Sequence, residues 1–193
     1  MCGVIQILEI LSQYYCRLLL IDWKARNISM TDLNVTDPTF IDDLKESELA
    51  VWVAAKWLHS RGHFVLIPPT IIRPDARERA AYSDGGDLQI IRKPKRHWER
   101  VEVKRRLSIN FTDGVDFPFE TVIVDVAHSW DNADPKPVGY IIVSSDLSSG
   151  MIVNTKTTSS KWRRVEKYDA HVKRSREYYE CPVNLCKFVK FDK

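Results

Sequence analysis

Hydrophobic and polar positions recur along the chain in two different periods, and the change of period divides it into elements. Apolar residues recur at helical spacing through LKESELAVWVAAKWLHSRG, which predicts a helix that begins at Asp42 or Asp43 and stops at Gly62. Six short runs rich in Val and Ile follow and predict strands: HFVLIPP, GDLQII, RVEVKRR, FETVIVDVAHSW, GYIIVSSD and GMIVNT. Pro94 lies between the second and third runs and cannot continue a strand ladder, so these two strands are expected to form a hairpin.

The two ends of the chain differ from this middle part. Residues 161–179 have a helix-forming composition with few strand residues, which predicts another helix. The stretch GVIQILEILSQYYCRLLLI fits an amphipathic helix, and Glu9 and Arg17 break it too often for it to span a bilayer. We therefore predict a helical arm or appendage in residues 1–29 and one domain in residues 30–193. The order helix, strands, helix predicts an α/β fold with a mixed central β-sheet flanked by helices.

Composition and charge add to this picture. The chain has 193 residues, of which 44% are hydrophobic and 28% are charged, as in folded globular proteins. The four cysteines contain no Cys-x-x-Cys pair, so we expect free thiols and a cytoplasmic, intracellular protein without a membrane partner. The net charge is only +3, but residues 92–106 hold eight bases against two acids. Such a block suits a polyanionic partner, and its ordinary alternative is a solvated surface.

Three charged residues lie in the predicted hairpin. Side chains alternate along a strand, so Glu102 and Lys104 point to one face of RVEVKRR. If this strand pairs with GDLQII, then Asp87 reaches the same edge, and two carboxylates converge beside an ammonium group. Magnesium is bound by oxygen ligands, commonly by one or two carboxylates together with substrate phosphate. The pattern therefore predicts a site that hydrolyses phosphodiesters, with Asp87 and Glu102 as ligands of Mg²⁺ or Mn²⁺ and Lys104 assisting the attacking water.

The arrangement Asp87, fourteen residues, Glu102, one residue, Lys104 resembles the PD-(D/E)XK nuclease superfamily. This resemblance implies a restriction-endonuclease-like fold, in which the acid and the acid-x-Lys pair lie on the second and third strands. It also implies an Mg-dependent endonuclease that acts on DNA, with RNA as the alternative substrate, and a homodimer by analogy. The proline that often precedes the first acid in the family is replaced here by Gly86.

An acid on the first helix often completes this site in the superfamily. Helical spacing places Glu48 on the same side as Leu44 and Val51, the side expected to pack on the sheet, so Glu48 is preferred to Glu46 as the fourth catalytic residue. Asp125 and His128 lie three residues apart, which would put them on opposite faces of a strand and argues against joint ligation.

Basic residues near the acid strand and in the C-terminal segment are the predicted nucleic-acid contacts. These are Arg105, Arg106, Lys161, Arg163, Arg164 and Lys173. No motif for sequence-specific readout is visible, so we expect a structure-specific or relaxed-specificity endonuclease.

Three other interpretations remain open at this level. Glu102 and Lys104 could form a buried ion pair, with Asp87 and Glu48 as caps. The chain could be a noncatalytic nucleic-acid-binding module that keeps the fold for packing, or a protein-interaction protein whose N-terminal arm docks on a partner.

Overall fold

A computed structural model describes residues 38–69, 86–92, 94, 97–169 and 173–191. The predicted arm in residues 1–29 lies outside this range, as do Cys2 and Cys16. Residues 38–193 form one compact unit.

The first described helix, α2, spans Pro38–Ser60. It begins four residues before Asp42, because the fixed backbone angle of a proline suits the first turn of a helix. Its end is where the sequence predicted it: Gly62 has a φ of +84°, and its N–H donates to the carbonyl of His59 at 2.9 Å. A left-handed glycine of this kind is a common helix terminator.

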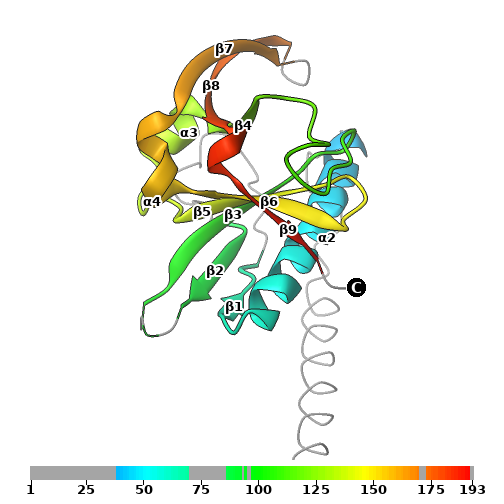
Figure 1. Cartoon of the computed structure of the whole chain (residues 1–193), viewed down its shortest axis with the longest axis vertical. Helices are drawn as coiled ribbons and strands as arrows, with labels where there is room; N and C mark the ends of the chain where they lie inside the picture. The colour runs from blue at the N-terminus through cyan, green and yellow to red at the C-terminus, as the bar shows by residue number, and fades with distance from the viewer. Residues whose placement is uncertain (1–37, 70–85, 93, 95–96, 170–172, 192–193) are drawn as a thin grey trace, which may run out of the picture. The chain divides into compact units, whose positions relative to one another are not determined.

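In the described residues nine strands form two sheets (Figure 1). The six-stranded sheet has the order β1-β2-β3-β5-β6-β9, in which β3 and β5 are parallel and the other neighbours are antiparallel. The second sheet has the order β4-β8-β7 and is antiparallel. The strand bounds are β1 Phe64–Leu66, β2 Leu88–Ile91, β3 Glu99–Arg105, β4 Thr121–Val126, β5 Gly139–Val143, β6 Ser149–Asn154, β7 Arg163–Asp169, β8 Arg174–Pro182 and β9 Lys187–Lys190. The predicted mixed sheet and the β2–β3 hairpin are confirmed.

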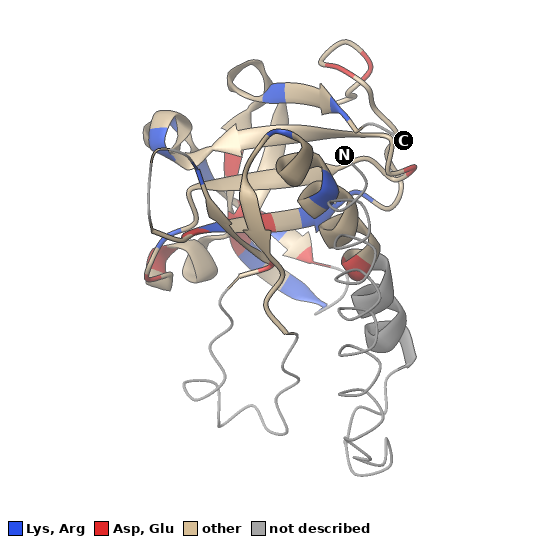
Figure 2. Ribbon diagram, turned by 90° about the horizontal axis from the view of Figure 1, so that it is seen from below, with Lys and Arg blue, Asp and Glu red and all other residues tan. Residues whose placement is uncertain are grey.

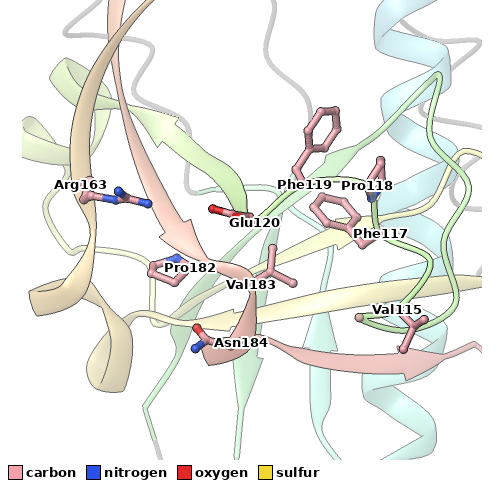
Figure 3. A pocket seen from close by; sticks show the side chains of 10 residues that line it. Val115, Phe117, Pro118, Phe119, Glu120, Arg163, Pro182, Val183 and Asn184 are labelled. Carbon is pink, nitrogen blue, oxygen red and sulfur yellow. The ribbon is translucent and has the colours of Figure 1, made fainter.

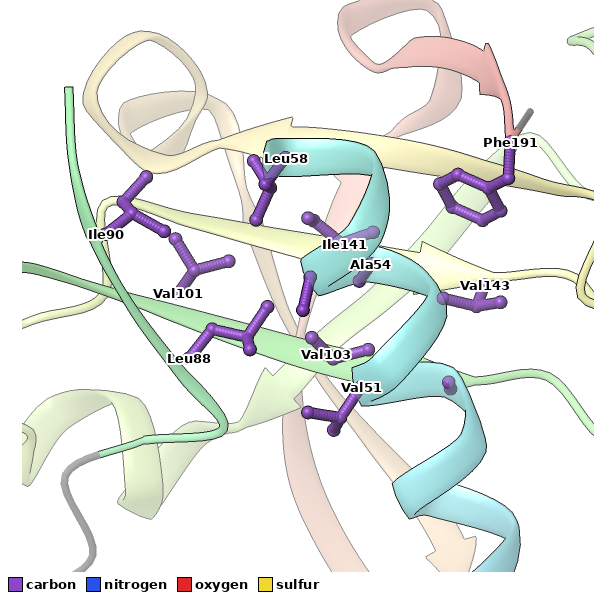
Figure 4. Packing of buried hydrophobic residues seen from close by; sticks show 12 residues of the cluster. Val51, Ala54, Leu58, Leu88, Ile90, Val101, Val103, Ile141, Val143 and Phe191 are labelled. Atoms are coloured by element: carbon purple, nitrogen blue, oxygen red, sulfur yellow. The ribbon is translucent and has the colours of Figure 1, made fainter. Parts of the chain in front are cut away.

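Helix α2 covers one face of the six-stranded sheet (Figure 4). Ala54 and Leu58 of α2 pack against Val101 and Val103 of β3 and against Ile141 of β5, and all five side chains are buried. Burial of such apolar surface is the main force that joins a helix to a sheet. One face of β3 is thereby committed to the core.

The second sheet contributes to a second core, which contains the other face of β5 and β6. Val122 and Val124 of β4 and Cys181 of β8 pack there with Tyr140 and Met151, and all five are almost completely buried. The sequence pattern had predicted a sheet flanked by helices. In the described residues α2 packs on one face of the six-stranded sheet, and the second sheet packs on the other face. Cys181 and Cys186 are free thiols whose sulfur atoms lie 3.9 Å apart.

Two local predictions are wrong. The segment 161–179 is not a helix but contains β7 and most of β8, which curve together at the top of the view in Figure 1. Its lysines, arginines and glutamates favour a helix by composition, but opposite charges pair across the two strands, as in the contact of Arg164 with Glu177. The predicted strand FETVIVDVAHSW ends at Val126, and its last residues begin α3, Ala127–Asn132. The other helical turns in the part of the chain that the structure describes are α4, Thr155–Thr158, η2, Ser159–Lys161, and η3, Val183–Leu185.

Candidate active site

The β2–β3 hairpin brings Asp87 and Glu102 together. In this antiparallel pair Leu88 is the partner of Val101, so the next position of the same register places Asp87 opposite Glu102. Asp87 Oδ2 accepts a hydrogen bond of 2.7 Å from the backbone N–H of Val103. Asp87, directly before β2, and Glu102 on β3 are thus held next to one another, as the sequence predicted.

Gly86 permits this approach. It has a φ of +87°, and a Cβ atom added to it would lie 2.6 Å from Arg100 Cγ and 2.9 Å from Glu102 Oε1. A residue with a side chain would therefore be strained and would press on Glu102. A glycine at this position therefore has a steric reason.

Glu102 lies in an environment that disfavours its negative charge. Burial, followed by the negative charge of Asp87, raises the pKa of Glu102 from 4.5 to about 7. Arg100 acts in the opposite direction, since its Nε atom donates to Glu102 Oε1 at 2.5 Å. The charge of Lys104 also lowers this pKa, but the two cations do not compensate fully for burial and for a second carboxylate, so the site favours a further positive charge.

Lys104 is held by a residue of the second sheet. Its Nζ atom donates to Asp125 Oδ1 at 3.1 Å and lies 5.7 Å from the ring centre of Tyr140. Asp125 comes from β4, so this ion pair joins the second sheet to β3. The ammonium group is thereby oriented beside Glu102, on the face of β3 that α2 does not cover.

Tyr140 and the backbone orient Asp125 in turn. The Tyr140 hydroxyl donates to Asp125 Oδ2 at 2.8 Å, and the N–H of Val126 donates to Oδ1 at 2.9 Å. Burial, with the negative charge of Asp125, raises the pKa of Tyr140 far above its usual value, so this hydroxyl remains a donor throughout the physiological range. The carboxylate that anchors Lys104 is therefore itself fixed by two donors.

The alternative interpretation, an ion pair between Glu102 and Lys104, differs from the pairing in the structure. Glu102 pairs with Arg100, and Lys104 pairs with Asp125. Acidic and basic positions lie next to one another on the strands at the centre of Figure 2. Sequence reasoning missed Arg100 and Tyr140, and it gave Asp125 no part in this group. The alternation along β3 could have identified Arg100, since it shares a face with Glu102.

Glu48 and His128 are placed differently from this group. Glu48 is exposed on α2, and the indole N–H of Trp52 donates to it at 3.4 Å. The buried side of α2 packs on Val101 and Val103, the face of β3 opposite to Glu102. His128 is exposed in α3 and is contacted by Asn132.

The predicted nucleic-acid contacts fall into two groups. Three are engaged with the protein: Arg105 donates to Ser145 O, Arg106 to Ile123 O, and Arg164 pairs with Glu177 and Asp131. Burial also lowers the pKa of Arg106. Lys161, Arg163 and Lys173 are exposed.

The donor set fits a hard divalent cation. Within the described ranges, no three histidine, cysteine or acidic side chains converge to hold a metal ion. Magnesium does not need three, because waters and substrate phosphate commonly complete its octahedral shell. Asp87 and Glu102 supply the two carboxylates such a site uses, and their mutual repulsion would be relieved by a cation.

A pocket of about 720 Å³ lies elsewhere (Figure 3). Its lining comes from the loop before β4, the end of β8, η3 and Arg163 of β7, and includes Phe117, Phe119 and Asn184. Asp87, Glu102 and Lys104 do not line it.

No family model matches the chain, and no curated protein or solved structure matches it either. In the part of the chain that the structure describes, none of the helices has the length and apolar character to cross a membrane.

The raised pKa of Glu102 predicts a pH-dependent stability. Between about pH 4.5 and 7 the folded protein holds a proton that the unfolded chain releases, so the free energy of unfolding should fall as pH rises through this range. A fall of about 2–3 kcal/mol is expected in urea unfolding of the metal-free protein. Glu102→Gln should remove it.

The comparison of the wild type with Glu102→Gln isolates the contribution of Glu102 to the pH dependence of stability. Burial, followed by the positive charge of Arg92, lowers the pKa of His63, which contributes with the opposite sign but equally in both proteins. Parallel stability curves for the wild type and Glu102→Gln would contradict the prediction.

Gly86→Ala should destabilise the fold more than Gly62→Ala. Both glycines have a positive φ, which costs an alanine about 1–2 kcal/mol. Only Gly86 also has atoms of Arg100 and Glu102 within 3 Å of the added Cβ, whereas nothing lies within 4 Å at Gly62. An excess loss of about 1–2 kcal/mol is expected from chemical denaturation. Equal losses would show that Arg100 moves aside without cost.

Proposed function

We propose that this protein is a metal-dependent nuclease that hydrolyses phosphodiester bonds of DNA, as a structure-specific or relaxed-specificity endonuclease with a restriction-endonuclease-like fold. The observation that carries the proposal is the pairing of β2 with β3, which sets Asp87 opposite Glu102 with Lys104 on the same face of β3. A helix and a strand precede these two strands, in the order that the resemblance implies.

The proposed roles of the two acids follow from their charge. Asp87 and Glu102 would hold Mg²⁺, with Mn²⁺ as a substitute, and so bring the scissile phosphate to the face of β3 that carries Lys104. A cation bound there supplies neutralisation of the phosphate charge and activation of water. Arg100 keeps the Glu102 side chain in one orientation through its 2.5 Å hydrogen bond.

Lys104 has the proposed role of a positioned hydrogen-bond donor. Its ammonium group can orient the attacking water or stabilise the charge that develops on the phosphate in the transition state. Asp125 fixes the position of this group, and Tyr140 fixes Asp125. A donor that is already in place needs no rearrangement when charge develops, which is how such groups lower a barrier.

Nicking of supercoiled plasmid DNA with and without Mg²⁺ tests the proposal. We expect cleavage to need the metal, to stop in EDTA, and to fall on the order of 10³-fold in Asp87→Asn and 10²-fold in Lys104→Ala. Binding of Mn²⁺, followed by electron paramagnetic resonance, should be lost in Asp87→Asn and kept in Lys104→Ala.

Two matched variants serve as controls. Glu166→Gln changes an exposed acid of β7, and Glu48→Gln changes the exposed acid of α2; both should cleave at the wild-type rate. Loss of cleavage in Glu48→Gln would show that Glu48 belongs to the active site after all. DNA binding without metal-dependent cleavage by the wild type would refute the nuclease and favour a binding module.

Asp125→Asn should lower kcat by about 10–100-fold, since an amide holds the ammonium of Lys104 less firmly than a carboxylate. The KM for DNA and the affinity for Mn²⁺ should not change, because Asp125 bonds to Lys104 and not to the two proposed ligands. Tyr140→Phe removes one donor to Asp125 and should have a smaller effect in steady-state kinetics. A change in KM alone would assign Asp125 to substrate binding.

A further inference from the structure

The hairpin of β7 and β8 has two faces with different charge. The pairing of Arg163 with Glu180 and of Asp169 with Arg174 fixes which side chains share a face. The face that carries Arg163, here called the Arg163 face, holds four bases and two acids: Arg163, Lys167, Arg174 and Arg176 with Asp169 and Glu180. The opposite face, here called the Arg164 face, holds one base and two acids: Arg164 with Glu166 and Glu177.

Ion pairs neutralise part of the Arg163 face and leave a surplus at its two ends. Lys167 pairs with Glu180, and Arg176 pairs with Asp169 at 3.3 Å. Arg163 and Arg174 are exposed, and among the described residues no carboxylate lies within ion-pair distance of either. They are separated by six positions along the hairpin, which is about 20 Å, or about six phosphates of one strand in a duplex.

This face adjoins the row of β3 that carries the candidate site. Glu102, Lys104 and Arg106 are every second residue of an extended chain, so their side chains lie on the same side. Arg106 interacts with the negative charge of Glu180 at the base of the Arg163 face. From Glu102 to Arg106 the row extends about 13 Å. Arg106 is itself largely buried, and its Nη2 atom donates to Ile123 O of β4, so it joins the strand of the candidate site to the base of the Arg163 face.

We propose that the Arg163 face of the β7–β8 hairpin binds the phosphate backbone of the nucleic acid. The inference rests on the proposed function for its choice of polyanion. It assigns the contact to Arg163 and Arg174, which lie outside the ion pairs of Lys167 and Arg176, and it excludes Arg164, which is held between Glu177 and Asp131 on the other face. Contacts of this kind position the substrate and carry no base sequence, in agreement with relaxed specificity.

Two double variants with the same change in net charge test which face binds. Arg163→Ala with Arg174→Ala removes two positive charges from the Arg163 face. Tyr168→Glu with Ser175→Glu adds two negative charges to the Arg164 face of the same hairpin, at exposed positions. Binding of a fluorescein-labelled duplex of about 20 base pairs, and of its single strand, is measured by anisotropy in EDTA over a range of salt concentrations.

The Arg163-face variant is expected to bind about 10-fold more weakly than the wild type, with a salt dependence reduced by about 1.4–1.8 in the slope of log K against log salt. The Arg164-face variant should bind within about 3-fold of the wild type. Equal effects of the two variants, or no binding by the wild type at low salt, would overturn the inference. Asp87→Asn should bind like the wild type, so tight, hairpin-dependent binding without cleavage would refute only the proposed reaction. Unchanged thermal unfolding of both double variants shows that the fold is intact.

Discussion

The pairing of β2 with β3 is the constraint on which the rest of the site depends. It sets Asp87 against Glu102 in a half-buried position, where neither carboxylate can move away without breaking the hydrogen bond to Val103 or the contact with Arg100. Burial of Glu102, followed by its repulsion by Asp87, disfavours the negative charge, and the raised pKa of Glu102 expresses that cost. A proton or a cation relieves it. The fold therefore keeps a place where positive charge is favoured.

The part of this arrangement that follows from local periodicity could be predicted from the sequence. β3 is buried on the face of Val101 and Val103, so its alternation is clear, and the position of Glu102 and Lys104 on the other face follows from it. Gly62 ends α2 as expected because the reason is local. The β7–β8 hairpin could not be recognised in the same way, since half of its residues are exposed, with some on each face, and no apolar alternation marks the strands.

The part that depends on contacts between layers could not be predicted. Asp125 meets Lys104 only because β4 pairs with β8 in the second sheet and not with a strand of the six-stranded sheet. The pairing of β4 with β8 has an irregularity between Ile123 and Asp125. The spacing of Asp125 and His128 argued only against joint ligation and indicated no partner for Asp125. The chain turns into α3 directly after Val126. The hydrophobic pattern of a strand does not show which of two sheets the strand joins. Tertiary pairing, and not propensity, decides the environment of such a carboxylate.

The same limit applies to the count of basic residues. In the sequence, Arg163 and Arg164 lie in one basic segment, and nothing in the sequence distinguishes them as contacts for an anion. The strand register separates them, since neighbours on a strand lie on opposite faces. Arg164 meets Glu177 and Asp131, whereas Arg163 stays exposed on a face with a surplus of positive charge. The field that an anion meets is therefore set by cross-strand pairing, which removes some charges and leaves others, and only the remaining charges can attract a polyanion.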